Sequence, residues 1–214
     1  LGCMNWAGGD PLLNTFITYP EGELARIVFH ELAHQVVYVK NDTMFNESYA
    51  TAVERLGGER WLSQQAGAAA RTEYAAFDAR RRAFRAFTLE VRKRLAAIYA
   101  DTATDDATRL QQKGEVMARF RQDYEALKHG WGGHAGYDAW VARANNAAFA
   151  TQAAYDELVP GFEALFEQEG RDFTRFHAAV RVLGNLPKDE RHARLRQLGL
   201  TVTTAVAAHS ATTP

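Results

Sequence analysis

The chain has 214 residues, of which 47% are hydrophobic and 24% are charged, and its formal net charge is −1. This composition is typical of a globular protein with one domain, or one domain and an appendage. The near-neutral charge gives no electrostatic reason to expect a nucleic-acid partner. The single cysteine, Cys3, excludes an internal disulfide framework, and no apolar run reaches the roughly 18 residues of a membrane span.

The N-terminal segment combines glycine, proline and aromatic residues, which predicts irregular structure or a short strand around residues 15–18. The chain begins with Leu1 rather than methionine, so we expect a processed or trimmed polypeptide whose active site could include residues upstream. Pro20, followed by the acidic Glu21 and Glu23, predicts the start of a helix that runs to about residue 39.

The expected helix over residues 21–39 carries the motif His30-Glu31-Leu32-Ala33-His34 among apolar residues. Residues four apart lie on one helix face, roughly 6 Å from each other, so both imidazoles can reach one zinc ion. Glu31 lies about 100° around the helix from His30, beside the metal rather than under it. A carboxylate there can take the proton of a water that zinc has activated. The motif therefore predicts a zinc site with His30 and His34 as ligands and Glu31 as general base.

A catalytic zinc ion needs a third protein ligand if its fourth position stays open for water. Residues 40–44 predict a turn, after which Asn46 is expected to cap a second helix that runs to about residue 65 and folds back across the first. This helix carries Glu47 in its first turn, and Glu54 lies on roughly the same face. One glutamate could be the ligand and the other an acceptor for a histidine N–H. Histidines distant in sequence are further alternatives: His129, His134, His177, His192 and His209.

A helical hairpin is expected over residues 66–128. Gly57 and Gly58 predict an interruption or a kink in the preceding helix, near Trp61. Apolar residues then recur at helical spacing on both sides of a turn at residues 101–106. Two such stripes joined by a short turn predict an antiparallel pair. The acidic residues Asp78 and Glu90 are interleaved with the basic residues between 80 and 94, which favours a solvated outer face. The stripes consist of Phe77, Phe84, Phe87, Val91, Leu95 and Ile98, and of Leu110, Met117, Phe120, Tyr124 and Leu127.

The rest of the chain predicts further helices and almost no strand, so the expected fold class is mainly α with little or no sheet. The glycine-rich stretch at 129–136 lacks the spacing of a phosphate-binding motif. Helices are expected near residues 138–156, 160–169, 172–183 and 188–198. The expected organisation is zinc-site helices with an irregular N-terminal segment at 1–65, a hairpin arm at 66–128, C-terminal helices completing the catalytic domain at 129–200, and a disordered tail at 201–214.

The sequence "FHELAHQVVYV…FNESYATAVERLG" resembles the paired zincin-like helices of the gluzincin metallopeptidases, whose third ligand is a glutamate preceded by asparagine. A closer resemblance, from "DPLLNTFITYPEGELARIVFHELAHQ" through "NNAAFATQAAYDELVPGFEALF" to "LPKDERHARL", is to a bacterial family of predicted aminopeptidases that are often lipoproteins. It implies His30, His34 and Glu47 as ligands of one Zn²⁺ ion and Glu31 as general base. The connection from His34 to Glu47 is shorter than in the reference gluzincins, so Glu54 stays an alternative ligand.

The resemblance implies zinc-dependent hydrolysis of peptide bonds, of aminopeptidase type, with a peptide substrate. It also implies a location in the bacterial cell envelope, with membrane association only through a lipid anchor outside this chain. A tyrosine or histidine commonly stabilises the oxyanion in related peptidases, and Tyr155, His134 and His177 are unassigned candidates. One alternative is a helical interaction protein with a structural zinc ion, whose hairpin binds a partner. A second is a peptidase fold without turnover. A fourth protein ligand would favour the structural ion.

Overall fold

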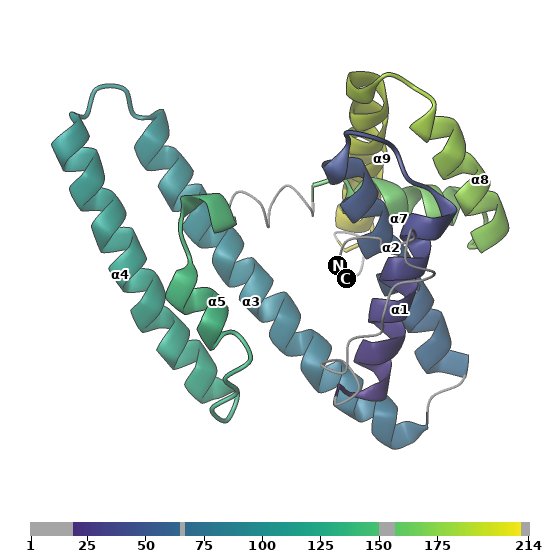
Figure 1. Cartoon of the computed structure of the whole chain (residues 1–214), viewed down its shortest axis with the longest axis horizontal. Helices are drawn as coiled ribbons and strands as arrows, with labels where there is room; N and C mark the ends of the chain where they lie inside the picture. The colour runs from purple at the N-terminus through teal and green to yellow at the C-terminus, as the bar shows by residue number, and fades with distance from the viewer. Residues whose placement is uncertain (1–18, 65–66, 150–156, 211–214) are drawn as a thin grey trace, which may run out of the picture. The chain divides into compact units, whose positions relative to one another are not determined.

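The computed structural model describes residues 19–64, 67–149 and 157–210, and these residues are mainly helical, with no strand among them (Figure 1). The mainly α fold class is therefore confirmed. The strand expected around residues 15–18 lies outside the described residues. The chain divides into two compact units, one formed by residues 1–75 and 158–214 and the other by residues 76–157. Along the sequence, the second unit is thus inserted into the first.

The first unit contains five long helices that share one hydrophobic core. They are α1 (Glu21–Val36), α2 (Thr43–Gln64), α7 (Val159–Gln168), α8 (Phe173–Gly184) and α9 (Lys188–Ser210). Phe45 and Tyr49 of α2 both pack on Phe162 of α7, with ring centroids 5.2 and 5.8 Å apart, and Tyr49 also contacts Phe176 of α8. These rings are fully buried, and their contacts pack α2 against α7 and α8.

Small residues line the contact between helices α1 and α2 and leave no room for larger side chains. Ala33 and Ala50 are fully buried, and a Cβ atom added to Gly57 would lie 3.1 Å from the Phe29 ring. A Cβ atom on Gly58 would lie 2.8 Å from Cγ of Arg26. The glycine pair therefore allows close packing and does not interrupt α2, which is continuous from Thr43 to Gln64. The interruption expected there is absent from α2.

The start of α2 also differs from the expectation. Asp42, not Asn46, caps the helix, because its Oδ1 accepts a hydrogen bond from the Phe45 amide at 3.3 Å. The side chain of Asn46 instead donates to the Val39 carbonyl and accepts from the Val39 amide, both at 2.8 Å. The helix begins earlier than predicted, and Asn46 fixes the loop between α1 and α2.

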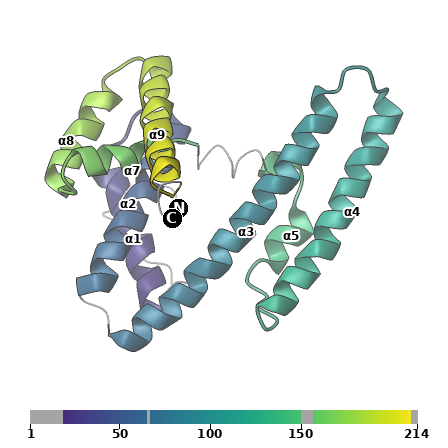
Figure 2. The same ribbon diagram turned by 180° about the vertical axis from the view of Figure 1, so that it is seen from behind.

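Helix α3 (Ala68–Ala100), which belongs to the second unit from Ala76 onward, and α4 (Asp106–Gly130) run antiparallel and form the expected hairpin (Figure 2). Asp105 caps α4 through the Thr108 amide at 2.9 Å. Phe84 and Phe87 of α3 pack on Tyr124 and Phe120 of α4, with ring centroids 6.1 and 5.2 Å apart. The buried core of this unit lies between the two apolar stripes of the hairpin and is closed by α5 (Asp138–Arg143) and the residues that follow it. Its other buried members are Val91, Leu95 and Met117 of the hairpin and Val141, Ala144 and Phe149.

Two helix ends in the C-terminal part differ from the expectation. The helix predicted over 138–156 stops at Arg143, because Asn145 Oδ1 accepts from the Ala148 amide at 3.0 Å and starts a new turn. The tail predicted from residue 201 is helical as far as Ser210, the end of α9. Alanine, the best helix former, recurs in that segment, and the prediction underestimated its effect.

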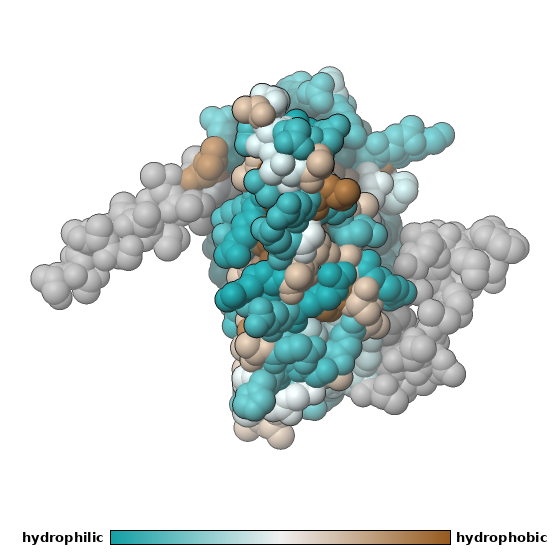
Figure 3. All heavy atoms as spheres, turned by 90° about the vertical axis from the view of Figure 1, so that its left-hand side faces the viewer, coloured by the Kyte–Doolittle hydropathy of each residue, from teal (hydrophilic) through white to brown (hydrophobic). Residues whose placement is uncertain are grey.

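The outer surface of the hairpin is mostly hydrophilic, with scattered apolar residues, as Figure 3 shows for the side on which α4 lies in Figure 1. Basic side chains of α3 are exposed and form ion pairs within the helix, such as those of Lys93 and Arg94 with Glu90. The predicted solvated basic face is therefore present. None of the described helices combines the length and apolar character that a membrane span requires.

Candidate metal centre

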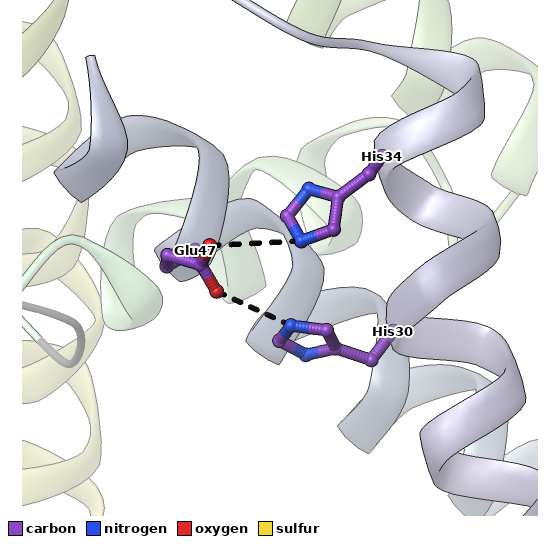
Figure 4. Close-up of side chains that lie close together, drawn as sticks. All are labelled: His30, His34 and Glu47. Carbon is purple, nitrogen blue, oxygen red and sulfur yellow. Dashed lines mark hydrogen bonds and ion pairs between the residues drawn. The ribbon is translucent and has the colours of Figure 1, made fainter. Parts of the chain in front are cut away.

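Two histidines and one glutamate face one another across the α1–α2 contact. The rings of His30 and His34 lie one turn apart on α1, with centroids 5.1 Å from each other. Glu47, in the second turn of α2, points between them (Figure 4). Its Oε2 lies 3.3 Å from His30 Nε2, and its Oε1 lies 3.7 Å from His34 Nε2. The convergence predicted for His30, His34 and Glu47 is therefore observed.

This group could hold a metal ion. Its ligand atoms all lie within 4.8 Å of one another. Two ligands about 2.0–2.1 Å from a tetrahedral ion are about 3.4 Å apart, close to the two distances from Glu47 to the imidazoles. Two imidazoles and one carboxylate also form a donor set that suits zinc. Among the described residues the group has three members, which leaves a fourth position for water or substrate.

Glu54 lies on the opposite edge of His30. Its Oε2 is 2.9 Å from His30 Nδ1, and its other oxygen forms an ion pair with Arg26. An ionised carboxylate can only accept, so Nδ1 donates the proton in this contact and the other ring nitrogen is turned towards Glu47. Of the two glutamates left open by the sequence, Glu47 faces both histidines, and Glu54 orients one of them.

The charges of the group show how it behaves without a metal ion. Burial disfavours the imidazolium form of His30, but hydrogen bonds to Glu47 and Glu54 outweigh this effect and raise the pKa of the ring to about 9. The hydrogen bond with His30 lowers the pKa of the Glu47 carboxyl. Burial lowers the pKa of His34 and so favours its neutral form. The carboxylates thus favour a positive charge between them, and a proton on His30 supplies it when a cation does not.

Glu31 does not join the group but lies beside it on α1. The residue is half-buried, and its Oε2 has no hydrogen-bond partner among the described residues. A buried acceptor without a donor is rare in folded proteins, because the lost hydration is not replaced. The same holds for His34 Nδ1, which has no partner among the described residues. Among the described residues, Glu31 Oε2 and His34 Nδ1 are thus two buried polar atoms at or next to the metal group in the sequence of α1 that lack a partner.

The remaining candidates for the site differ in their surroundings. His177 of α8 is hydrogen-bonded through Nδ1 to the Tyr49 hydroxyl at 2.8 Å. It lines an apolar cavity of about 420 Å³ between α1, α2 and α8, together with Phe29 and Trp61. His134 belongs to the second unit, where its ring contacts Phe77 and Tyr137.

None of the alternative third ligands whose side chains are described joins the group. His192 of α9 is buried, and its Nε2 lies 2.9 Å from Asp42 Oδ2. His129 is exposed at the end of α4, in the second unit. Tyr155, the third oxyanion candidate, lies outside the described residues, and nothing is described of the His209 side chain.

Sequence reasoning missed Arg26 and Glu23, which are both buried on α1. Arg26 Nη1 lies 3.1 Å from Glu23 Oε1, and its other terminal nitrogen pairs with Glu54. A signal for them exists in the sequence. Arg26 precedes His30 by four residues, so the two share a helix face, and an arginine amid an apolar stripe is unusual there.

A family model described as "Putative aminopeptidase" matches residues 1–195, which include every helix except the end of α9. The matched span contains the described metal group and Glu31. No curated protein and no solved structure is similar enough to this chain to count as a match.

Proposed function

The chain belongs to the family described as "Putative aminopeptidase", and on this premise we propose that it is a zinc-dependent peptidase of the gluzincin type. In this proposal His30, His34 and Glu47 hold one Zn²⁺ ion and Glu31 acts as general base. The observation that carries it is the approach of Glu47 to both imidazoles, at 3.3 and 3.7 Å. On the helix of the two histidines, one carboxylate oxygen of Glu31 has no hydrogen-bond partner among the described residues.

The protein's own residues would divide the work of peptide hydrolysis. A bound zinc ion would polarise the scissile carbonyl and lower the pKa of the attacking water. Glu31 takes the proton from this water as the oxygen attacks the carbonyl carbon. The carbon–nitrogen bond then breaks, and Glu31 passes the proton to the departing amine. Glu54 holds the His30 ring so that Nε2 faces Glu47.

Two observations favour an enzyme over a protein with a structural ion. Structural zinc sites are usually closed by four protein ligands, whereas this group has three among the described residues. The Glu47 side chain also keeps 30% of its surface exposed, so water can reach the group. A peptidase fold without turnover shares both features, and only a measured reaction separates it from the proposal.

The proposal is tested by Glu31→Gln, with metal content and peptide cleavage measured on the same sample. We expect one zinc ion per chain in both proteins and a decrease in kcat of about 10²–10⁴-fold in the variant, because a general base contributes that much. Glu21→Gln, at an exposed position of the same helix, is the matched control and should cleave normally.

Cleavage is best followed with a peptide library and mass spectrometry, which identifies the terminus at which products form. Removal of single residues from the N-terminus supports the aminopeptidase type. Loss of zinc from Glu31→Gln together with activity contradicts the role of this residue. Bound zinc without cleavage of any library peptide favours the structural ion or the peptidase fold without turnover.

A further inference from the structure

We propose that Arg26 is a positioning residue of the metal centre, which acts through Glu54 on His30 and is itself anchored by Glu23. The inference rests on the metal site of the proposed function. It goes beyond that site because Arg26 and Glu23 do not belong to the metal group.

A continuous chain of charged contacts leads from the core to the metal group. Glu23 Oε1 is 3.1 Å from Arg26 Nη1, and Arg26 Nη2 pairs with Glu54 Oε1. The second oxygen of Glu54 is 2.9 Å from His30 Nδ1, and His30 Nε2 is 3.3 Å from Glu47. Each contact joins an ionised group to a donor or acceptor, and such bonds are stronger and more directional than neutral ones.

The burial of this chain shows that it serves more than stability. The side chains of Arg26 and Glu23 are only 5% and 8% exposed, and that of Glu54 is 18% exposed. Removing charges from water costs several kcal/mol per ion, and apolar residues of similar size often stabilise a core equally well. A function that needs Glu54 in one orientation gives a reason for charges at this position.

The shape of Arg26 suits this task. Its planar guanidinium is held at one terminal nitrogen by Glu23 and presents the other to Glu54. Glu54 can then direct its free oxygen at His30 Nδ1. Gly58 leaves room for the arginine stem, since a Cβ atom there would lie 2.8 Å from Arg26 Cγ. A lysine keeps the charge but lacks the fork that binds two carboxylates at fixed angles.

Loss of this orientation would weaken metal binding. If Glu54 turns away, His30 Nδ1 loses its acceptor, and the ring no longer holds Nε2 towards Glu47. Partners of this outer kind typically change metal affinity by about 10–100-fold when they are removed. We expect Arg26→Lys to weaken zinc binding about tenfold and Glu54→Gln to weaken it by at least as much.

A double-mutant cycle on the full chain tests whether Arg26 acts through Glu54. Zinc dissociation constants are measured by competition with a chelating dye for the wild type, Arg26→Lys, Glu54→Gln and the double variant. We expect Arg26→Lys to cause less than about a twofold change when Glu54 is already glutamine. Arg55→Lys is the matched control, because Arg55 of α2 also joins a glutamate, Glu163, at 3.2 Å and should leave zinc affinity unchanged.

A second readout needs no metal. In the metal-free protein, the hydrogen bond to Glu54 should protect the His30 Nδ1–H proton from exchange with water, so that ¹⁵N-edited NMR detects it. We expect this resonance to be lost in Arg26→Lys and kept in Arg55→Lys. If Arg26→Lys does not fold, Glu23→Gln tests the same series of contacts with Arg26 intact. The His30 Nδ1–H resonance should also be weakened in that variant.

Three results would overturn the inference: zinc affinity unaffected by Arg26→Lys, an equal loss in both backgrounds of the cycle, or a protected His30 proton that survives the substitution. Failure of the proposed function is different. A wild-type chain that binds no zinc contradicts the metal site, whereas the exchange measurement still decides whether Arg26 positions Glu54 and His30.

Discussion

The contact between α7 and α9 predicts that Gly161→Ala destabilises the protein, although alanine is the better helix former. Gly161 lies in the first turn of α7 and faces α9. A Cβ atom added there would lie 2.1 Å from the carbonyl oxygen of Leu195 and 2.7 Å from its carbonyl carbon. These are backbone atoms, so no side chain can rotate away to make room.

The magnitude follows from the shift that the new methyl group requires. Heavy atoms in contact prefer about 3.5–4.0 Å, so α9 would have to move by more than about 1 Å. Overpacking typically costs about 1–3 kcal/mol, and a rigid backbone obstacle places this site at the upper end. The higher helix propensity of alanine returns about 1 kcal/mol. We expect the free energy of unfolding to fall by about 2 kcal/mol.

Gly114→Ala is the matched control for this prediction. Gly114 is exposed in the middle of α4, and a Cβ atom there would have no neighbour within 4 Å. The same substitution should therefore stabilise its own unit by up to about 1 kcal/mol. Hydrogen exchange followed by mass spectrometry reports on α7 and α4 separately. Unchanged or slower exchange of α7 in Gly161→Ala would refute the steric argument.

Three further predictions concern charges and the metal ion. In the metal-free protein, the rise of the His30 pKa from 6.5 to about 9 means that the protonated ring contributes roughly 3 kcal/mol to the free energy of unfolding. This contribution is complete below pH 6.5 and is lost as the pH rises through 9. Urea unfolding at several pH values should show the loss, which Glu47→Gln should make smaller. Asp42→Asn leaves Arg191 buried without its counterion and should cost about 3–5 kcal/mol, whereas Glu190→Gln at an exposed pair should cost less than about 1 kcal/mol. If free zinc is present at about 1,000 times its dissociation constant, its removal by a chelator should lower the free energy of unfolding by about 4 kcal/mol. A calorimetric Tm that does not change when chelator is added would contradict a bound metal ion.

The metal group could be predicted from sequence because its geometry is local. His30 and His34 share a face by helical spacing alone, and the short loop after α1 forces α2 to return beside it. The assignment between Glu47 and Glu54 could not be completed in this way. Both glutamates lie on one side of α2. Only the three-dimensional arrangement of α1 and α2 shows that Glu47 faces the Nε2 edge of His30 and Glu54 the Nδ1 edge.

The errors of the sequence analysis arose where tertiary contacts override a local preference. Asn46 is a good helix cap in isolation, but Asp42 satisfies the free amides of α2 earlier in the chain, so Asn46 binds Val39. Gly57 and Gly58 were expected to interrupt or kink α2, and the helix continues through them because α1 passes at that point, which nothing in the local pattern indicates. The ion pair between Arg26 of α1 and Glu54 of α2 joins two helices, and no periodicity within either helix reveals it.

The insertion of residues 76–157 into the first unit has a consequence for folding on the ribosome. Helices α1 and α2 emerge early, yet the rings that cover Phe45 and Tyr49 belong to α7 and α8, which are synthesised after the whole insertion. At about 5–20 residues per second, the apolar faces of the first two helices wait several seconds for their partners. During that interval the hairpin can complete its own core from contacts that are close in sequence. The nascent chain should therefore acquire its inserted unit first, and the metal group should reach its final geometry only when the C-terminal helices have left the exit tunnel.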